Sequence, residues 1–278
     1  MGSTALVLGG GALVGGAWLT GVLAGLHDAG VDVTRADIVI GTSAGAVFGA
    51  RLLAGEPARE LYARQLAGAD GVELGVTLGQ TVRYLRAALG SRDPQRSARR
   101  LGAAALKART GPESVVLNVV QGLLNGVREW PGDTLRITAV DALSGHLETF
   151  DADSGVPLLD AVAASCAVPV VWPPVTVAGR RWMDGGSRST ANLHLARGHH
   201  HVLAVAPIPA AVGPHPGAEW QAAELAADGV DVTLVTPDRA ARRAMGRDMT
   251  ADARRPAAAR AGYAQGSAAA AAVSEVWR

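Results

Sequence analysis

Apolar residues form continuous runs of strand length in four parts of the chain. The runs are TALVLG (4–9), DIVIG (37–41), HVLAVAPI (201–208) and VDVTLVTP (230–237). Continuous apolar runs are typical of parallel strands whose two faces are both covered by helices. The segments 15–30 and 44–53 follow the first two runs and are predicted to be helices. This alternation of strand and helix indicates an α/β fold with a mostly parallel central sheet.

A different pattern occupies the region from about 57 to 130, where leucine and valine recur at helical spacing. Glycine-containing breaks at 90–91 and 111–112 divide it, so we predict several helices inserted between strands of the sheet. The later segments are predicted to be strands at 134–145 and 147–151, a helix at 157–169 and a hairpin at 175–186. The Ala-rich tail, about 251–278, is predicted to be helical at its end. Because no repeat or linker divides the chain, we expect residues 1–278 to form a single three-layer α/β/α domain.

The first 26 residues raise the question of a membrane span, because Thr4 to Leu26 contains no charged side chain. Seven of these 23 residues are glycine, which destabilises a helix interior by about 1 kcal/mol each. No basic segment precedes them, as a signal peptide would require. We therefore predict a buried strand, a glycine turn and a buried helix, with neither a signal peptide nor a transmembrane span.

The composition supports a folded chain with a large core, since 49% of the 278 residues are hydrophobic and 18% are charged. A net charge of +1 gives no field that would favour a nucleic acid as partner. The single cysteine, Cys166, excludes a disulfide framework and suits a reducing compartment. We expect a cytoplasmic location, with peripheral contact to a membrane.

Positive charge is concentrated in one part of the predicted insertion. Leu74 to Pro112 contains eight Lys or Arg residues and one acid, a local charge of +7. Two interpretations stay open for the basic side chains between Arg83 and Arg109. They line solvated helix faces, or they form a surface that contacts anionic lipid headgroups.

The strongest chemical signal is GTSAG, residues Gly41 to Gly45, between a predicted strand and a predicted helix. It fits the G-x-S-x-G pattern, in which a strained turn presents the serine at the end of the sheet. Glycines are needed on both sides because side chains there would collide. Ser43 is therefore the candidate nucleophile, and the following helix directs its positive end toward a developing oxyanion.

A serine needs a base, and two sources lie downstream. Asp184 lies in the turn MDGG after a predicted strand, although an aspartate there also commonly bonds its own backbone. His194 and His199 to His201 would instead give the order Ser, Asp, His of an α/β-hydrolase triad. Three adjacent histidines cannot all face one way and no acidic cluster accompanies them, so we expect no metal.

The glycine-rich turn at the start, LVLGGGALVGGAW (6–18), fits neither common phosphate-binding motif. It has no Lys for a Walker-type loop, and the G-x-G-x-x-G pattern fails by one residue. What it offers is a series of backbone N–H groups at the start of a helix. Such donors stabilise an oxyanion next to a nucleophile.

These three elements, in this order, resemble the patatin-like phospholipases, and the segment Ala164 to Val175 strengthens the resemblance. The similar region extends from about Leu6 to Pro207. The resemblance implies a Ser43–Asp184 dyad without histidine and hydrolysis of lipid esters without a cofactor. The positions that it assigns are an oxyanion hole at Gly10, Gly11 and Ala12, a nucleophile turn at Gly41 and Gly45, and an aspartate turn at Gly185 and Gly186.

The sequence departs from the family pattern at two positions of the first turn. Ala12 stands where a glycine is usual, and Val14 stands where a basic residue is usual. Ala12 keeps its N–H for the oxyanion hole provided that its backbone needs no positive φ. The change motivates an alternative, a non-catalytic acyl-lipid-binding protein on the same fold. An acyltransferase would share every motif, and the sequence does not determine the oligomeric state.

Overall fold

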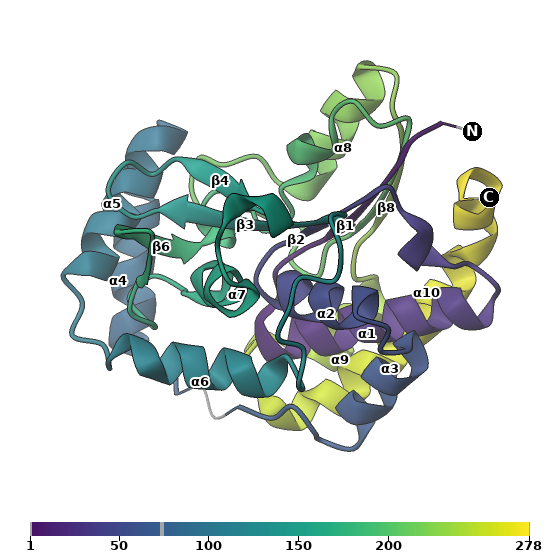
Figure 1. Ribbon diagram of the computed structural model, residues 1–278, viewed down its shortest axis with the longest axis horizontal. Helices are drawn as coiled ribbons and strands as arrows, with labels where there is room; N and C mark the ends of the chain where they lie inside the picture. The colour runs from purple at the N-terminus through teal and green to yellow at the C-terminus, as the bar shows by residue number, and fades with distance from the viewer. Residues whose placement is uncertain (1, 73–74, 278) are drawn as a thin grey trace.

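The computed structural model describes residues 2–72 and 75–277, which form one eight-stranded sheet between two layers of helices (Figure 1). The strands are β1 (Thr4–Leu8), β2 (Ile38–Gly41), β3 (Leu135–Asp141), β4 (Leu147–Phe150), β5 (Val175–Val177), β6 (Arg180–Asp184), β7 (His201–Val205) and β8 (Asp231–Val235). Their order is β5-β6-β3-β2-β1-β7-β8, with β4 also paired to β3. Strands β3, β2, β1, β7 and β8 are parallel, and β4, β5 and β6 run antiparallel to their neighbours. The predicted α/β class with a mostly parallel sheet is confirmed.

The helices cover both faces of this sheet. They are α1 (Ala12–Asp28), α2 (Ala44–Leu53), α3 (Ala58–Leu66), α4 (Leu78–Ala88), α5 (Pro94–Leu106), α6 (Glu113–Leu123), α7 (Leu158–Cys166), α8 (Ala218–Ala227), α9 (Arg239–Met245) and α10 (Arg255–Val276). Helices α1, α2 and α10 lie on one side of the strands and α8 lies on the other (Figure 1). The three-layer α/β/α arrangement is therefore confirmed. The sequence pattern did not predict α8 or α9.

Strand β1 shows why its apolar run is continuous. Leu6 and Leu8 pack into the core on the side of α1, whereas Ala5 and Val7 pack on the side of α8. Successive side chains of a strand point to opposite faces, so a strand covered on both faces needs apolar residues throughout. The helix predicted after it at 15–30 is observed at Ala12–Asp28, so it begins earlier, directly after Gly11.

The predicted insertion at about 57–130 consists of α3, α4, α5 and α6, apart from residues 73–74, which lie outside the described part. Ala87 and Ala88 of α4 pack with Leu101 of α5 against Val140 and Met183 of the sheet. The pair α4–α5 thereby covers the end of the sheet that α8 leaves free. The sheet needs this cover because Val140 and Met183 face away from the α1 layer.

Strand β3 brings two chain segments together that are distant in sequence. Ile137 pairs with Gly41 of β2 on one edge and with β4 on the other. Ala139 pairs with Asp184 of β6 and again with β4. Since a strand has two edges, β2 and β6 share one edge of β3 and meet with their carboxyl ends. The residues after Gly41 therefore lie next to Asp184.

The Ala-rich tail, predicted over about 251–278, contains α10. Arg278, the last residue of the predicted range, lies outside the described part. The helix packs along α1 (Figure 1), and glycines of both helices lie at the contact. A Cβ atom on Gly21 would lie 2.1 Å from the Ala259 oxygen, and one on Gly262 would lie 2.0 Å from the Trp18 oxygen. The glycines of α1 thus permit backbone-to-backbone packing. Among the described residues, no helix combines the length and hydropathy that crossing a bilayer requires.

Candidate active site

Ser43 lies in a strained turn between β2 and α2. Its backbone angles are φ 53° and ψ −117°, a combination that an L-residue adopts only at a cost. A Cβ atom on Gly45 would lie 2.0 Å from the Leu8 oxygen, and one on Gly41 would lie 2.6 Å from the Ala46 Cα. Both glycines are therefore sterically required, as the motif predicts. The turn places the Ser43 side chain at the start of α2 and at the carboxyl edge of the sheet.

A second serine, which the sequence analysis did not single out, holds this turn. The Ser43 backbone N–H donates to Ser165 Oγ over 2.9 Å. Ser165 is buried near the end of α7, within the segment 164–175 that carries part of the family resemblance. Local pattern gives no reason for a hydroxyl there, because its partner is 122 positions away.

Asp184 ends β6 and is buried beneath the same cavity as Ser43. The Gly186 N–H donates to its Oδ1 over 2.6 Å, so the aspartate does brace its own turn. Burial raises the pKa of this carboxyl to about 6, and the Gly186 amide and the Ser43 hydroxyl oppose the rise. A carboxyl with this pKa is half-ionised at about pH 6 and mostly ionised at pH 7, and such a pKa near the working pH suits proton transfer.

A cluster of buried polar side chains connects the turn at Ser43 to the turn after Asp184. Thr42 Oγ1 lies 2.8 Å from Thr138 Oγ1, and Asn192 Nδ2 donates to Thr42 Oγ1 over 3.0 Å. A Cβ atom on Gly185 would lie 2.2 Å from Thr138 Oγ1, so that turn also needs its glycine. Thr42 precedes Ser43, and Thr138 underlies the turn after Asp184. The cluster therefore fixes the relative position of the two turns, and sequence reasoning missed it.

The glycine-rich turn lies beside Ser43. Gly10 approaches it closely, since a Cβ atom there would lie 3.3 Å from the Ser43 Cβ. However, the Gly10 N–H already donates to the Thr190 oxygen over 2.7 Å. The amides of Gly11 and Ala12 have no hydrogen-bond partner among the described residues. Of these three amides, those of Gly11 and Ala12 are therefore the ones without a partner in the described part of the chain.

Ala12 stands where the family usually has glycine, and its backbone adopts the positive φ that favours glycine. Its φ is +49°, in the left-handed region that costs an L-residue about 1–2 kcal/mol. Alanine at this position therefore carries backbone strain that glycine would avoid. Val14, the other departure, is fully buried, and its N–H donates to the Met249 oxygen over 3.0 Å.

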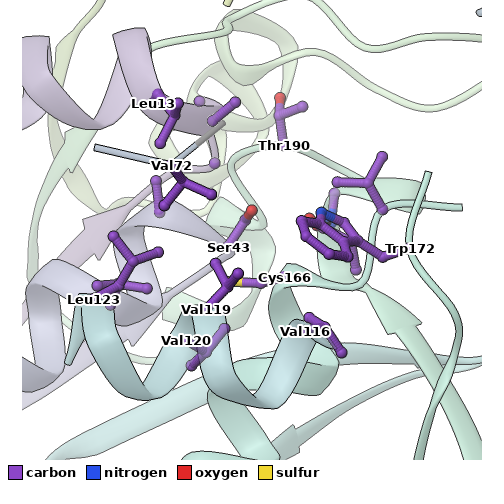
Figure 2. Close-up of a pocket in the computed structure, with 18 of the residues that line it drawn as sticks. Leu13, Ser43, Val72, Val116, Val119, Val120, Leu123, Cys166, Trp172 and Thr190 are labelled. Carbon is purple, nitrogen blue, oxygen red and sulfur yellow. Dashed lines mark hydrogen bonds between the residues drawn. The ribbon is translucent and has the colours of Figure 1, made fainter. Parts of the chain in front are cut away.

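A cavity of about 270 Å³ opens above Ser43 (Figure 2). The Ser43 hydroxyl points into it from the floor, surrounded by apolar side chains from several helices and loops (Figure 2). Apolar lining residues include Leu13, Val72, Val116, Val120, Leu123 and Trp172. The volume is close to the lower end of the range for small-molecule sites, and the lining suits a hydrocarbon chain.

Tyr84 and Cys166 are two further titratable side chains whose pKa values are affected by the Asp184 carboxylate. Burial raises the pKa of Tyr84 to about 12, and the charge of Asp184 adds to this shift. Burial also raises the pKa of the Cys166 thiol, as does Asp184, while the Ser43 hydroxyl lowers it. Both side chains stay protonated at neutral pH, so Asp184 is the one of these three groups that is ionised there.

The histidines lie elsewhere. His201 begins β7 and so lies at the amino edge of the parallel strands, opposite the edge of Ser43. His194 Nδ1 lies 3.3 Å from the Gln221 amide oxygen. None of the described residues that line the cavity is a histidine, and the described part of the chain contains no group of three or more potential metal ligands.

The fold and the buried serine turn define a protein of the α/β class with its candidate site at the carboxyl edge of the sheet. A family model described as Patatin-like phospholipase matches residues 6–197, which is more than half of the chain. The chain belongs to the patatin-like phospholipase family. The resemblance inferred from the sequence is confirmed.

Two solved structures of low sequence identity are similar to the chain. VipD from Legionella pneumophila is 15% identical with a TM-score of 0.36, and the match covers 66% of this chain and 46% of VipD. The type III effector protein ExoU is 14% identical with a TM-score of 0.43, and the match covers 98% of this chain and 53% of ExoU. The chain thus spans about half the length of these two proteins. No curated protein sequence matches it at a significant level.

Proposed function

We propose that the protein is a serine lipid acyl hydrolase in which Ser43 is the nucleophile and Asp184 its base. One observation carries the proposal. A strained serine and a buried carboxylate, whose pKa is raised to about 6, lie together at one apolar cavity. Backbone strain and a perturbed carboxyl cost stability, and such costs concentrate at functional sites.

In the proposed reaction, Ser43 Oγ attacks the acyl carbon of the ester and its proton passes to Asp184. The amides of Gly11 and Ala12 and the positive end of α2 stabilise the negative charge of the tetrahedral intermediate. Asp184 returns the proton to the leaving alcohol. Water then attacks the acyl-serine ester by the same route and regenerates both side chains.

The cavity favours an uncharged acyl chain as the bound group. Its lining includes Asp70 and Arg255, but both charges are paired. Asp70 accepts from Arg51 over 3.0 Å, and Arg255 donates to Asp252 over 2.9 Å. Family membership and this lining support a lipid ester as substrate, and the proposed chemistry requires no cofactor.

The test is hydrolysis of p-nitrophenyl butyrate by the wild type and by Ser43→Ala and Asp184→Asn. We expect each substitution to lower kcat about a thousandfold or more, because the nucleophile and its base act as a unit. His194→Ala is the matched control and should keep wild-type activity. An inactive His194→Ala variant would instead support a Ser-Asp-His triad.

A fluorophosphonate probe distinguishes the enzyme from a non-catalytic lipid-binding protein. Labelling of wild type but not of Ser43→Ala indicates an activated serine. A protein that binds phospholipid vesicles but resists the probe would refute the catalytic proposal. Product analysis with added alcohols separates a hydrolase from an acyltransferase.

A further inference from the structure

The outer face of α4 presents a row of large apolar side chains to solvent. Leu78, Val82, Leu85 and Leu89 are 80%, 48%, 39% and 63% exposed. Their spacing of four, three and four residues places them on one face of the helix. Three of them lie within α4 and Leu89 is its C-cap residue. Four such exposed residues on one short helix and its cap are unusual for an element that faces only water. We call Leu78, Val82, Leu85 and Leu89 the α4 stripe.

The opposite face of α4 packs against the body of the protein and borders the cavity above Ser43. Tyr84 lines that cavity, and Gln80 Nε2 donates to the Val170 oxygen over 3.2 Å. A capping box between Thr77 and Gln80 closes the amino end of the helix. The stripe is therefore displayed by an ordered helix that borders the site, and packing within the described chain does not cover it.

The basic side chains of α4 and of the segment that follows it have no internal counter-ion among the described residues. The eight Lys and Arg residues of the segment 74–112 are all exposed, and none forms an ion pair with a described residue. Arg83 and Arg86 lie on α4 itself, on one flank of the stripe. By contrast, Arg51, Arg64 and Arg180 in other parts of the fold each pair with two carboxylates.

We propose that α4 is a membrane-docking helix, whose stripe enters the headgroup–acyl boundary of an anionic bilayer while Arg83 and Arg86 contact lipid phosphates. An amphipathic helix with apolar residues on one face and arginines beside them binds such a surface through both contributions. Docking would hold the cavity, through Tyr84, against the surface that contains the substrate. This role rests on the proposed hydrolysis of lipid esters.

A second copy of the chain is a less suitable partner for the stripe. In a two-fold dimer the same patch meets itself, so Arg83 and Arg86 of both copies would lie in one interface. Like charges opposed across an interface are unfavourable, and no acidic side chain lies within α4 to compensate them. An anionic lipid surface complements both the apolar stripe and the charge.

The experiment compares binding to vesicles of phosphatidylcholine with and without phosphatidylglycerol, and uses the full chain. The double variant Leu78→Gln/Leu89→Gln should bind anionic vesicles at least about tenfold more weakly than wild type. Arg83→Gln/Arg86→Gln should lose about fivefold per arginine, and its binding should depend less on salt. The matched control is Trp220→Gln on α8, a 56% exposed apolar residue away from α4, which should bind like wild type.

Hydrolysis of p-nitrophenyl butyrate in solution separates docking from catalysis. The α4 variants should keep this activity while losing activity on vesicle phospholipid. Unchanged vesicle binding by Leu78→Gln/Leu89→Gln would overturn the proposal. So would sedimentation showing a dimer that this variant abolishes. If wild type hydrolysed no ester yet bound vesicles through α4, the proposed function would fail and the docking surface would stand.

Discussion

At the scale of single residues, the site stores strain next to the groups proposed to react. Ser43 and Ala12 both have positive φ, at 53° and 49°, and both line the cavity. For Ser43 the turn aims the hydroxyl, so the strain serves the proposed chemistry. For Ala12 no described hydrogen bond involves the side chain, and glycine would adopt the same φ without the steric cost. The same positive φ thus belongs to the proposed nucleophile at one residue and is a steric cost at the other.

Replacing Ala12 by glycine should therefore stabilise the protein. We expect Ala12→Gly to raise the free energy of unfolding by about 1 kcal/mol, because glycine adopts positive φ without a steric penalty. Urea denaturation measures the change. Ester hydrolysis should be unchanged or faster, since the N–H of residue 12 is retained. A destabilised variant would show that the alanine methyl contributes packing that outweighs the strain.

At the scale of elements, α1 and α10 show how a glycine-rich helix becomes stable. Gly21 and Gly25 of α1 face the backbone of α10, and Gly262 and Gly266 of α10 face that of α1. The helices approach until carbonyl oxygens occupy the positions of Cβ atoms, which buries α1 from Val14 to Leu26. Tertiary contact therefore compensates for the low helix propensity of glycine. The family match ends at residue 197, so α10 lies beyond it.

Enlarging one glycine at this contact should separate the helices. Gly262→Val places a Cβ atom 2.0 Å from the Trp18 oxygen, so we expect a loss of several kcal/mol of unfolding free energy. Gly122→Ala in α6 is the matched control, because a Cβ atom added there would have no neighbouring atom within 4 Å. The control should gain about 0.5–1 kcal/mol. Thermal unfolding of both variants measures the contrast, and equal effects would contradict close packing at Gly262.

The sequence pattern predicted most of these elements but not all of their ends. The strands at 4–9 and 37–41 and the turn at Ser43 were predictable because steric requirements there act within a few residues. Helix α8 was missed, since only Ala218, Gln221 and Leu225 are buried along it, which gives a weak apolar period. Ser165 and Asn192 were missed because their hydrogen-bond partners lie far along the chain.

At the scale of the whole molecule, the net charge is close to zero although positive and negative charge are unevenly distributed along the chain. Residues 74–112 carry a net charge of +7 and the whole chain carries +1, so the remainder carries −6. Such an asymmetric molecule is oriented by the field of an anionic surface before contact. The buried Asp184 carboxyl adds a second global effect, because its ionisation affects the stability of the entire fold.

The stability of the fold should depend on pH through Asp184. Its folded pKa, about 6, lies above the ordinary value of 3.8, so the native state binds its proton more tightly than the unfolded state. Native stability is therefore lost as the pH rises from about 4 to 6. Asp184→Asn lacks this titration, so relative to wild type it should gain about 1–3 kcal/mol between about pH 4 and pH 7. Urea denaturation at both pH values measures the gain, and a pH-independent difference would refute a raised pKa.

The sequence by itself determined the α/β class, the strained turn at Ser43 and the family, because these depend on short-range sterics and hydrophobic periodicity. Only the tertiary structure decided that β2 and β6 share one edge of β3, which brings Ser43 and Asp184 together across 141 positions of sequence. The tertiary structure also determined the positive φ of Ala12 and the burial of α1 against α10. Local pattern records the preferences of neighbouring residues, whereas these features depend on contacts between segments far apart in the chain.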